Sequence, residues 1–278
     1  MRLDAGCEIL FEASAPTPLI LMLRPRSGLG QWVFREEYLL EPSVPMVEYT
    51  DSYGNLCQRL LTPQGAFRVR AIASAETADQ IDVAPGAPFV PVQYVPDDVL
   101  QFLLPSRYCP SDRLGDLATE IVGDRTPGYD QVEAIRDWIH TQVKYQYGTS
   151  DASTSAYETA HDRVGVCRDF AHLGIALCRS LNIAARMVVG YLYQLDPMDL
   201  HAWFEAFVGD MHSDIPQGRW FTFDATQSQP RGNRVAIAYG RDAADVALAT
   251  QFGPLQLTEM RVWVEPSTWW CRDSVLFQ

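Results

Sequence analysis

The sequence lacks the marks of secreted, membrane and nucleic-acid-binding proteins. The residues after Arg2 contain no long apolar run, so we expect no secretory signal. No stretch approaches the roughly 18 uninterrupted apolar residues that a membrane helix needs. Basic residues are few: 22 Lys and Arg stand against 35 Asp and Glu, for a formal net charge of −13. Such an acidic surface argues against nucleic acid or anionic membranes as partners, and we expect a cytoplasmic protein.

Paired cysteines are also absent. The six cysteines are scattered and never form a Cys-x-x-Cys pair. In a chain of 278 residues this scatter predicts reduced thiols rather than a disulfide framework, and it argues against a zinc site. Apolar residues supply 47% of the chain and charged residues 21%, which is enough for a core and excludes wholesale disorder.

The first ninety-odd residues predict an all-β domain, either a sandwich or a barrel. Short segments rich in β-branched and aromatic residues alternate there with turn residues. The six expected strands are Ile9–Ala13, Leu19–Arg24, Gln31–Leu40, Met46–Tyr49, Leu56–Leu61 and Ala66–Ser74. A proline-rich stretch over 83–95 indicates a linker. We therefore expect a β domain over residues 1–93 and a second domain over residues 94–278.

The pattern becomes helical after the linker and then returns to strands. Ser111 is expected to cap the second of three helices, which are expected over 97–104, 111–122 and 129–144. A further helix is expected from Cys167 onward. Strands of one sheet are expected over 200–208, 220–224, 235–239 and 255–264.

Cys167 is the first candidate for chemistry. It follows Gly165, which supplies a permissive backbone, and it opens a helix whose apolar residues lie along one side. The dipole and the free N–H groups at a helix N-terminus favour a thiolate there. Cys178 lies about 20° around the same face but about 16 Å further along the axis, so we expect it to be a core residue that cannot share the site.

A thiolate nucleophile needs a base, and His201 is the best placed of five histidines. It opens a strong strand pattern in which Trp203, Glu205 and Phe207 share its face. The other four are less suitable: His140 belongs to a helix, His161 to a loop, His172 points about 140° away from Cys167, and His212 lies in a polar turn.

Asp224 is the candidate that orients the base. It follows four β-forming residues, where Asp is unusual. One interpretation is a residue that starts a turn with the help of Thr226. The other is a carboxylate that accepts the second ring N–H of His201 from a neighbouring strand, which fixes the tautomer and stabilises the imidazolium.

Three motifs in this order resemble the transglutaminase-like core superfamily, whose bacterial members are usually described as proposed cysteine proteases. They are Gly-Val-Cys-Arg-Asp-Phe-Ala, His-Ala-Trp-Phe-Glu and Phe-Asp-Ala-Thr, and their key residues are separated by 34 and 23 positions. The resemblance covers roughly residues 100 to 230. It implies an α+β fold with a papain-like core, in which a helix bundle carrying the cysteine packs on an antiparallel sheet. It also implies that Cys167 is the nucleophile, His201 the base and acid, and Asp224 the orienting group.

Some positions depart from the family pattern, but none of them is a candidate catalytic residue. Ala184 and Ala225 replace prolines that are common in the family, and Asn182 replaces a glycine, which Asn tolerates because it can adopt positive φ. Asp169 is interpreted as an acid at the start of a helix.

No residue aligns securely with the family's oxyanion-stabilising side chain. The candidates are the backbone N–H of Cys167 and the side chains of Tyr145 or Tyr147, with a core role for either tyrosine as the alternative. Trp203 is a further candidate for contact with substrate, because it shares the face of His201.

These residues predict acyl transfer on an amide bond through a thioester. Water as the resolving nucleophile would make the protein an amidase or protease, and an amine would make it a transamidating enzyme; the bacterial resemblance favours hydrolysis. A non-catalytic binding scaffold is the alternative from another class. The calcium sites of animal transglutaminases have no recognisable counterpart, so we expect no metal or cofactor and a peptide or protein amide as the partner. The apolar tail contains Trp269, Trp270, Val275, Leu276 and Phe277, and is expected to pack on the core or to form an oligomer contact.

Overall fold

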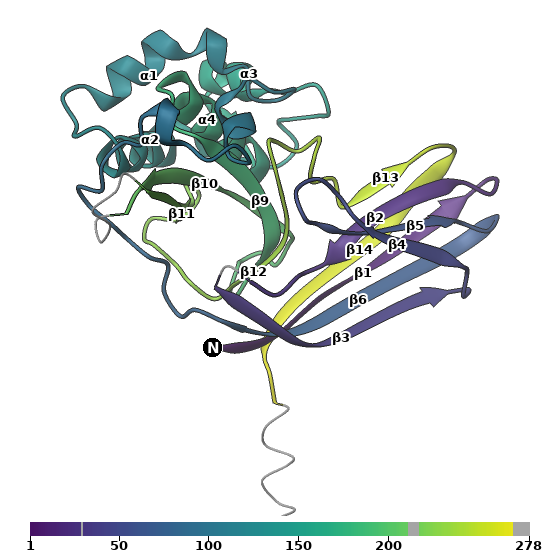
Figure 1. The fold of residues 1–278 in the computed structure, drawn as a ribbon. Coiled ribbons are helices and arrows are strands. Elements are labelled where there is room, and N and C mark those ends of the chain that lie inside the picture. Colours follow the sequence, from purple (N-terminus) through teal and green to yellow (C-terminus); the bar gives the residue numbers. More distant parts are fainter. Residues whose placement is uncertain (29, 211–216, 269–278) are drawn as a thin grey trace, which may run out of the picture.

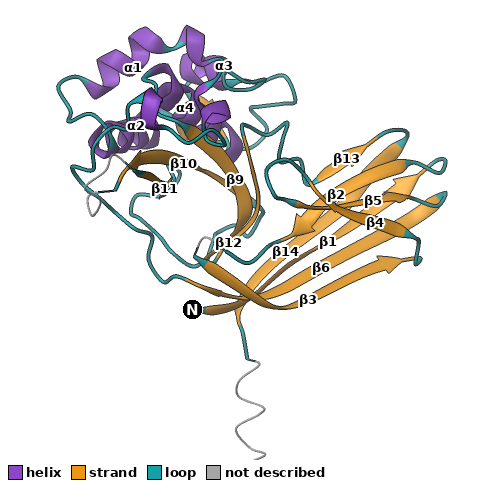
Figure 2. Ribbon diagram, in the orientation of Figure 1, coloured by secondary structure: helices purple, strands orange, loops and turns teal. Residues whose placement is uncertain are grey.

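The chain folds into a β sandwich and a sheet covered by helices on one face (Figures 1 and 2). The computed structural model describes residues 1–28, 30–210 and 217–268. The predicted apolar tail and His212 therefore lie outside the described residues. None of the helices within these ranges has the length and hydrophobicity that crossing a membrane requires.

All six strands predicted for the N-terminal part are present. They are β1 (Arg2–Ala13), β2 (Pro18–Arg24), β3 (Gln31–Glu41), β4 (Met46–Thr50), β5 (Leu56–Leu61) and β6 (Gly65–Thr77). β1 starts earlier than expected, because Leu3, Ala5 and Cys7 continue the inward alternation of Ile9 and Phe11. Two four-stranded sheets, β14-β1-β6-β3 and β13-β2-β5-β4, form the sandwich.

One strand prediction is wrong, because residues 255–264 do not complete the helix-covered sheet. They belong to β14 (Leu255–Pro266), which pairs antiparallel with β1, and β13 (Ala249–Gln251) pairs with β2. The pairing satisfies the backbone of β1 on the side away from β6 and buries Leu255 and Val264. Periodicity identifies a strand but does not say which sheet it joins. The boundary between residues 93 and 94 stays a prediction; the sandwich takes strands from both sides of it.

The second part is a helical layer on an antiparallel sheet, as predicted. The sheet has the order β11-β10-β9-β12, and its strands are β9 (Ala185–Leu192), β10 (His201–Gly209), β11 (Gly218–Phe223) and β12 (Arg234–Gly240). The helices are α1 (Gly115–Val122), α2 (Tyr129–Gln142), α3 (Ala156–Asp162) and α4 (Cys167–Ser180), with two-residue strands β7 (Lys144–Tyr145) and β8 (Val164–Gly165) between them.

Two of the helix predictions are corrected by the structure. The expected helix over 97–104 is a 3₁₀ turn, η2 (Leu100–Leu103), after another, η1 (Val92–Tyr94). The helix expected over 111–122 is interrupted: η3 (Ser111–Arg113) precedes α1, whose capping position is Leu114, so Ser111 caps no α-helix. The buried Ser111 instead accepts a backbone hydrogen bond from Leu114, which closes the 3₁₀ turn.

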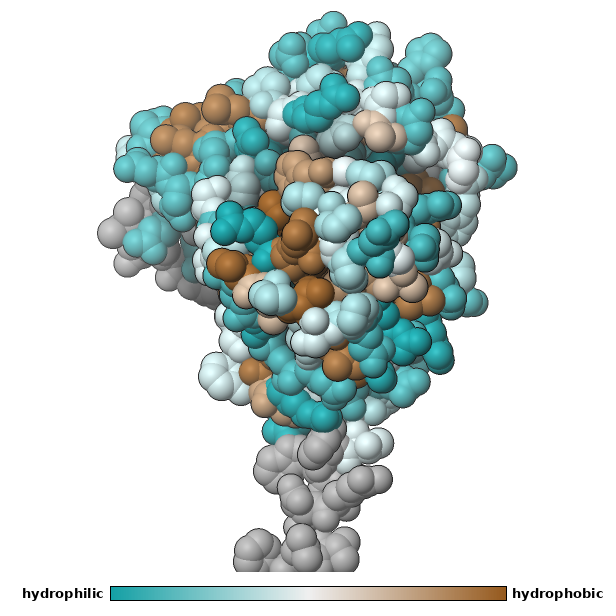
Figure 3. All heavy atoms as spheres, turned by 90° about the vertical axis from the view of Figure 1, so that its right-hand side faces the viewer, coloured by the Kyte–Doolittle hydropathy of each residue, from teal (hydrophilic) through white to brown (hydrophobic). Residues whose placement is uncertain are grey.

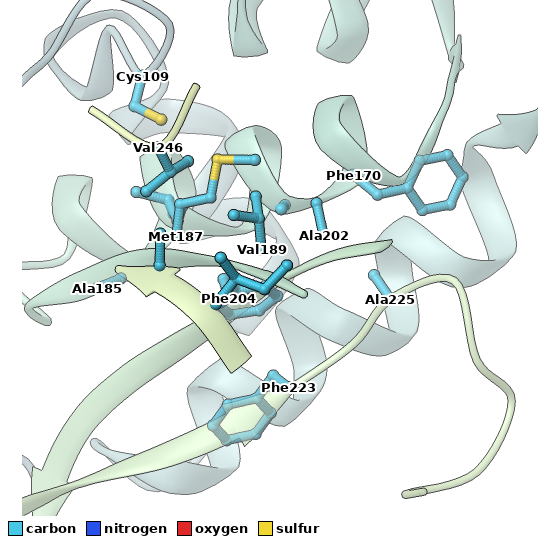
Figure 4. Packing of buried hydrophobic residues seen from close by; sticks show 14 of the residues in the cluster. Cys109, Phe170, Ala185, Met187, Val189, Ala202, Phe204, Phe223, Ala225 and Val246 are labelled. Atoms are coloured by element: carbon cyan, nitrogen blue, oxygen red, sulfur yellow. The ribbon is translucent and has the colours of Figure 1, made fainter. Parts of the chain in front are cut away.

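The core of the second part lies between α4 and the sheet. Side chains from β9, β10 and β11 meet those of α4 there (Figure 4). The ring of Phe204 packs directly against Gly174, where a Cβ atom would lie 2.5 Å from it. This close approach fixes the height of α4 above β10, and therefore the place of Cys167 at the end of the helix.

The sandwich is held to the sheet through β12. The side chain of Gln31 forms hydrogen bonds with both backbone groups of Ala236, and buried Asn55 does the same with Tyr239. The side-chain amides of Gln31 and Asn55 therefore provide additional hydrogen bonds that join the sandwich to the edge strand of the sheet.

Seen from the sandwich end, apolar side chains form several patches separated by polar ones (Figure 3).

Candidate active site

Cys167 is the first residue of α4, as the sequence predicted. It is partly exposed and packs at the edge of the core. Asp169 is buried and accepts a hydrogen bond from the backbone N–H of Val166 at 2.9 Å, which fulfils its expected role at the helix start. A Cβ atom on Gly165 would lie 2.7 Å from the Asp169 side chain. Gly165 is thus required to make room for this capping carboxylate; its φ is not positive.

Cys178 is a natural control for Cys167. It is fully buried on the same helix, and burial raises the pKa of its thiol well above the ordinary value. Burial likewise raises the pKa of Cys109 to about 12. Cys167 is half-buried instead, so it is open to an incoming electrophile in a way that Cys178 is not.

His201 and Asp224 meet at the end of the sheet. Nε2 of His201 and Oδ2 of Asp224 are 2.8 Å apart, and both side chains are almost fully buried. Because Nε2 contacts Asp224, Nδ1 is the ring nitrogen left to face the Cys167 side chain, which lies close enough to influence the charge of His201. The structure therefore brings together the three residues that the sequence selected.

The charges of this cluster are strongly coupled. Burial disfavours the charged form of His201, but the charge of Asp224 and hydrogen bonds to Asp224 and Cys167 outweigh it and raise the pKa of His201 to about 9. Burial alone would raise the pKa of Asp224. The charges of His201 and Arg234 outweigh this effect and hold the Asp224 pKa far below its ordinary value. At neutral pH the arrangement favours an imidazolium beside a carboxylate.

Asp224 combines the two roles that the sequence left open. β11 ends one residue earlier, at Phe223. Oδ1 accepts hydrogen bonds from the backbone and hydroxyl of Thr226 at 3.0 and 2.7 Å, which forms the turn, while Oδ2 faces His201. The turn thereby holds the carboxylate in the orientation that His201 needs.

The described histidines other than His201 have other partners. His140 bonds the backbone oxygen of Ala225 at 3.0 Å, and His161, which lies in α3 rather than in the predicted loop, pairs with Asp162. His172 is fully buried, stacks on Tyr108 and accepts a hydrogen bond from a backbone N–H. Burial lowers its pKa to about 4, so it is neutral at pH 7.

Tyr145 lies beside the nucleophile. Burial, together with the charge of Cys167, raises the pKa of Tyr145, and the backbone N–H of Cys167 lies near its hydroxyl. The ring of Tyr145 packs against Phe170 at 5.7 Å and against Tyr147 at 5.5 Å. Tyr145 and Tyr147 are 40% and 52% exposed, so neither is a core residue. Two of the expected oxyanion donors, the Cys167 N–H and the Tyr145 hydroxyl, therefore lie next to each other.

Trp203 and Glu205 lie behind His201. The Trp203 ring is buried and stacks on the His201 ring, with 6.1 Å between their centres. Glu205 forms an ion pair with Arg186 at 2.7 Å, which gives it a structural partner. A role for Trp203 in contacting substrate stays a prediction.

Arg234 is a residue of the candidate site that was not predicted from the sequence. Its Nη2 donates to Oδ2 of Asp224 at 2.9 Å, the oxygen that His201 also contacts, and its side chain is only 7% exposed. A signal was present: Arg234 directly precedes a continuous buried run, where an arginine needs a partner. Arg234 keeps Asp224 ionised and fixes its position.

Comparisons with known proteins agree with this geometry. A family model of the transglutaminase-like superfamily matches residues 115–225. The crystal structure of a proposed cysteine protease from Cytophaga hutchinsonii is 36% identical with a TM-score of 0.84, over 95% of this chain and 90% of that one. Uncharacterised proteins of Mycobacterium leprae and Mycobacterium tuberculosis are 27% and 29% identical over 81% of this chain, and over 82% and 77% of their own lengths.

The family model spans the helices, β9, β10 and β11, and therefore all three candidate residues. The match to the Cytophaga hutchinsonii protein extends over the β sandwich as well. These similarities support catalysis based on a cysteine in general terms. The chain belongs to the transglutaminase-like superfamily.

Proposed function

We propose that the protein is a cysteine-dependent amidase or protease that hydrolyses a peptide or protein amide bond through a thioester. The observation that carries the proposal is the position of His201, which lies between Cys167 on one side and Asp224, at 2.8 Å, on the other. This is the arrangement of nucleophile, base and orienting group that thiol acyl transfer requires.

In the proposed reaction, the thiol proton already resides on His201, and the Cys167 sulfur attacks the amide carbonyl carbon. The oxygen that becomes negative is stabilised by the Cys167 backbone N–H and the Tyr145 hydroxyl. His201 then gives its proton to the leaving amine, which leaves a thioester on Cys167. A water molecule, deprotonated by His201, attacks the thioester carbon and releases the acid and the free thiol.

Asp224 and Arg234 keep their charges throughout these steps. Asp224 remains a carboxylate because Arg234 and the two Thr226 donors hold it ionised. The His201 and Asp224 side chains are 2% and 4% exposed, so bulk water does not reach the hydrogen bond between them. Substrate therefore approaches from the side of the half-exposed Cys167.

Two linked measurements test the proposal. Iodoacetamide should alkylate Cys167 rapidly below pH 7 and much faster than Cys178. A mixed peptide library should be cleaved by the native chain and by Cys178→Ala but not by Cys167→Ala. Including a primary amine in the same assay distinguishes hydrolysis from transamidation. Equally slow labelling of both cysteines, with no turnover, would instead support a binding scaffold.

A further inference from the structure

The face of the helix-covered sheet that is turned away from α4 forms the floor of a groove. Alternation along β10 places Trp203, Glu205 and Phe207 on this face, opposite to Phe204, which packs on α4. The groove has a volume of about 550 Å³, in the range of small-molecule sites. Ala78, Gln80, Ile81 and Asp82, which follow β6, also line it.

Flat side chains form the walls of this groove. Phe207 and Trp220 pack edge to face at 5.3 Å. The guanidinium of Arg186 lies over the rings of Trp220 and Tyr239, at 4.1 and 4.5 Å, and is held there by Glu205. A flat, apolar molecule could pack against such surfaces over both of its sides.

The floor contains two buried N–H donors that are left unsatisfied by the described residues. Nε1 of Trp203 and Nη1 of Arg234 have no hydrogen-bond partner among them. The Arg234 guanidinium lies 5.0 Å from the centre of the Trp203 ring, so the two side chains pack against each other. Leaving such a donor unsatisfied costs about 1–3 kcal/mol, and both groups can only donate. An occupant of the groove that supplies oxygen acceptors would remove this cost.

The arginines that line the groove each have an acidic partner: Arg186 pairs with Glu205, Arg219 with Asp82 and Arg234 with Asp224. Because Nη2 of Arg234 is already used by Asp224, Nη1 is the nitrogen that faces no acceptor within the part of the chain that the structure describes. A carboxylate is the group that matches an arginine together with a second donor.

We propose that this groove binds a small carboxylate with a flat apolar body, its oxygens on Arg234 and Trp203 and its body against Trp220 and Phe207. The site lies directly behind the candidate active site, since Trp203 stacks on His201 and Arg234 contacts Asp224. The binding itself does not depend on the proposed function.

The test uses benzoate, 3-phenylpropionate and indole-3-acetate, each compared with its own carboxamide. Affinities are measured by NMR titration of the full chain, from the ligand signals and from the indole N–H resonances of the protein. At least one acid should bind with saturation, at least tenfold more tightly than its amide, and should shift the indole N–H resonance of Trp203. Equal affinity of every acid and its amide, or no saturable binding by any of them, would overturn the proposal.

Matched variants locate the bound acid. Trp203→Phe keeps an aromatic ring but removes the N–H, and should weaken acid binding at least fivefold while leaving amide binding unchanged. Trp138→Phe is the control, because Trp138 lies on α2 under Arg163, outside the groove. Binding that survives Trp203→Phe in a folded chain but disappears in Cys167→Ala would place the acid at the active site and contradict the proposal. If Trp203→Phe fails to fold, the native protein still decides: an indole resonance that the bound acid leaves unshifted would contradict the proposal equally.

Discussion

Replacing Asp224 by Asn should convert His201 from a predominantly charged group at pH 7 to a neutral one. Asn keeps the shape of the side chain and an oxygen that can still accept from the ring, but it removes the charge. Burial then acts against the imidazolium, and so does the neighbouring charge of Arg234. The pKa of His201, about 9 in the native protein, should fall below its ordinary value of 6.5.

The structure gives the size of this effect. The difference between about 9 and 6.5 is about 2.5 pH units, which corresponds to about 3 kcal/mol of preferential stabilisation of the charged form. Since the native pKa lies above the unfolded one, this contribution is fully present below pH 6.5 and is lost as the pH rises through about 9. The stability of the native chain should therefore decrease over that interval, and the decrease should be absent in Asp224→Asn.

The assay is an NMR titration of the imidazole carbons, which is practicable because the chain has five histidines. The His201 signal is assigned with His201→Gln. Asp242→Asn is the matched control: Asp242 is an equally buried acid that influences His172. If His201 still titrates near pH 9 in Asp224→Asn, or if Asp242→Asn moves it just as far, the charge of Asp224 is not what raises its pKa.

Two further substitutions test the supporting structure. Arg234→Leu should lower the free energy of unfolding by about 2–3 kcal/mol, since it removes one partner of a buried charged pair while Asp224 keeps His201 and Thr226. Urea unfolding measures this loss. Arg231→Leu is the control, because Arg231 forms hydrogen bonds with a neighbouring loop, and it should lower the free energy of unfolding clearly less. Equal losses would show that Asp224 does not depend on Arg234. Gly174→Ala should cost about 1–3 kcal/mol because its Cβ meets Phe204, and should slow alkylation of the cysteine at the helix start; an unchanged unfolding midpoint would contradict the close packing described for α4.

Local pattern predicted most elements of the fold. The six strands of the sandwich, α2, α4 and β10 follow from periodicity, which depends on neighbours in sequence. Asn182 has a φ of 59°, as the substitution of Asn for Gly indicated. The partner of β14 could not be predicted, because pairing with β1 depends on contacts about 250 residues apart that leave no local signal.

The candidate site could be predicted only in part. Cys167, His201 and Asp224 each stand in a recognisable local setting, and the structure brings them together. The contribution of Arg234 depends on how β12 crosses beside β9, which the sequence does not encode locally. The position of Tyr145 likewise results from the pairing of β7 with β8.

The pairing of β14 with β1 makes the helix-covered sheet an insertion within the sandwich. On a ribosome, the segment that carries Cys167, His201 and Asp224 would emerge before the last strand needed to close the sandwich beneath it. Until residue 266 is available, β1 has an open edge along its whole length, able to pair with another chain. The order of synthesis therefore means that the β sandwich is completed only after the segment that carries the candidate site.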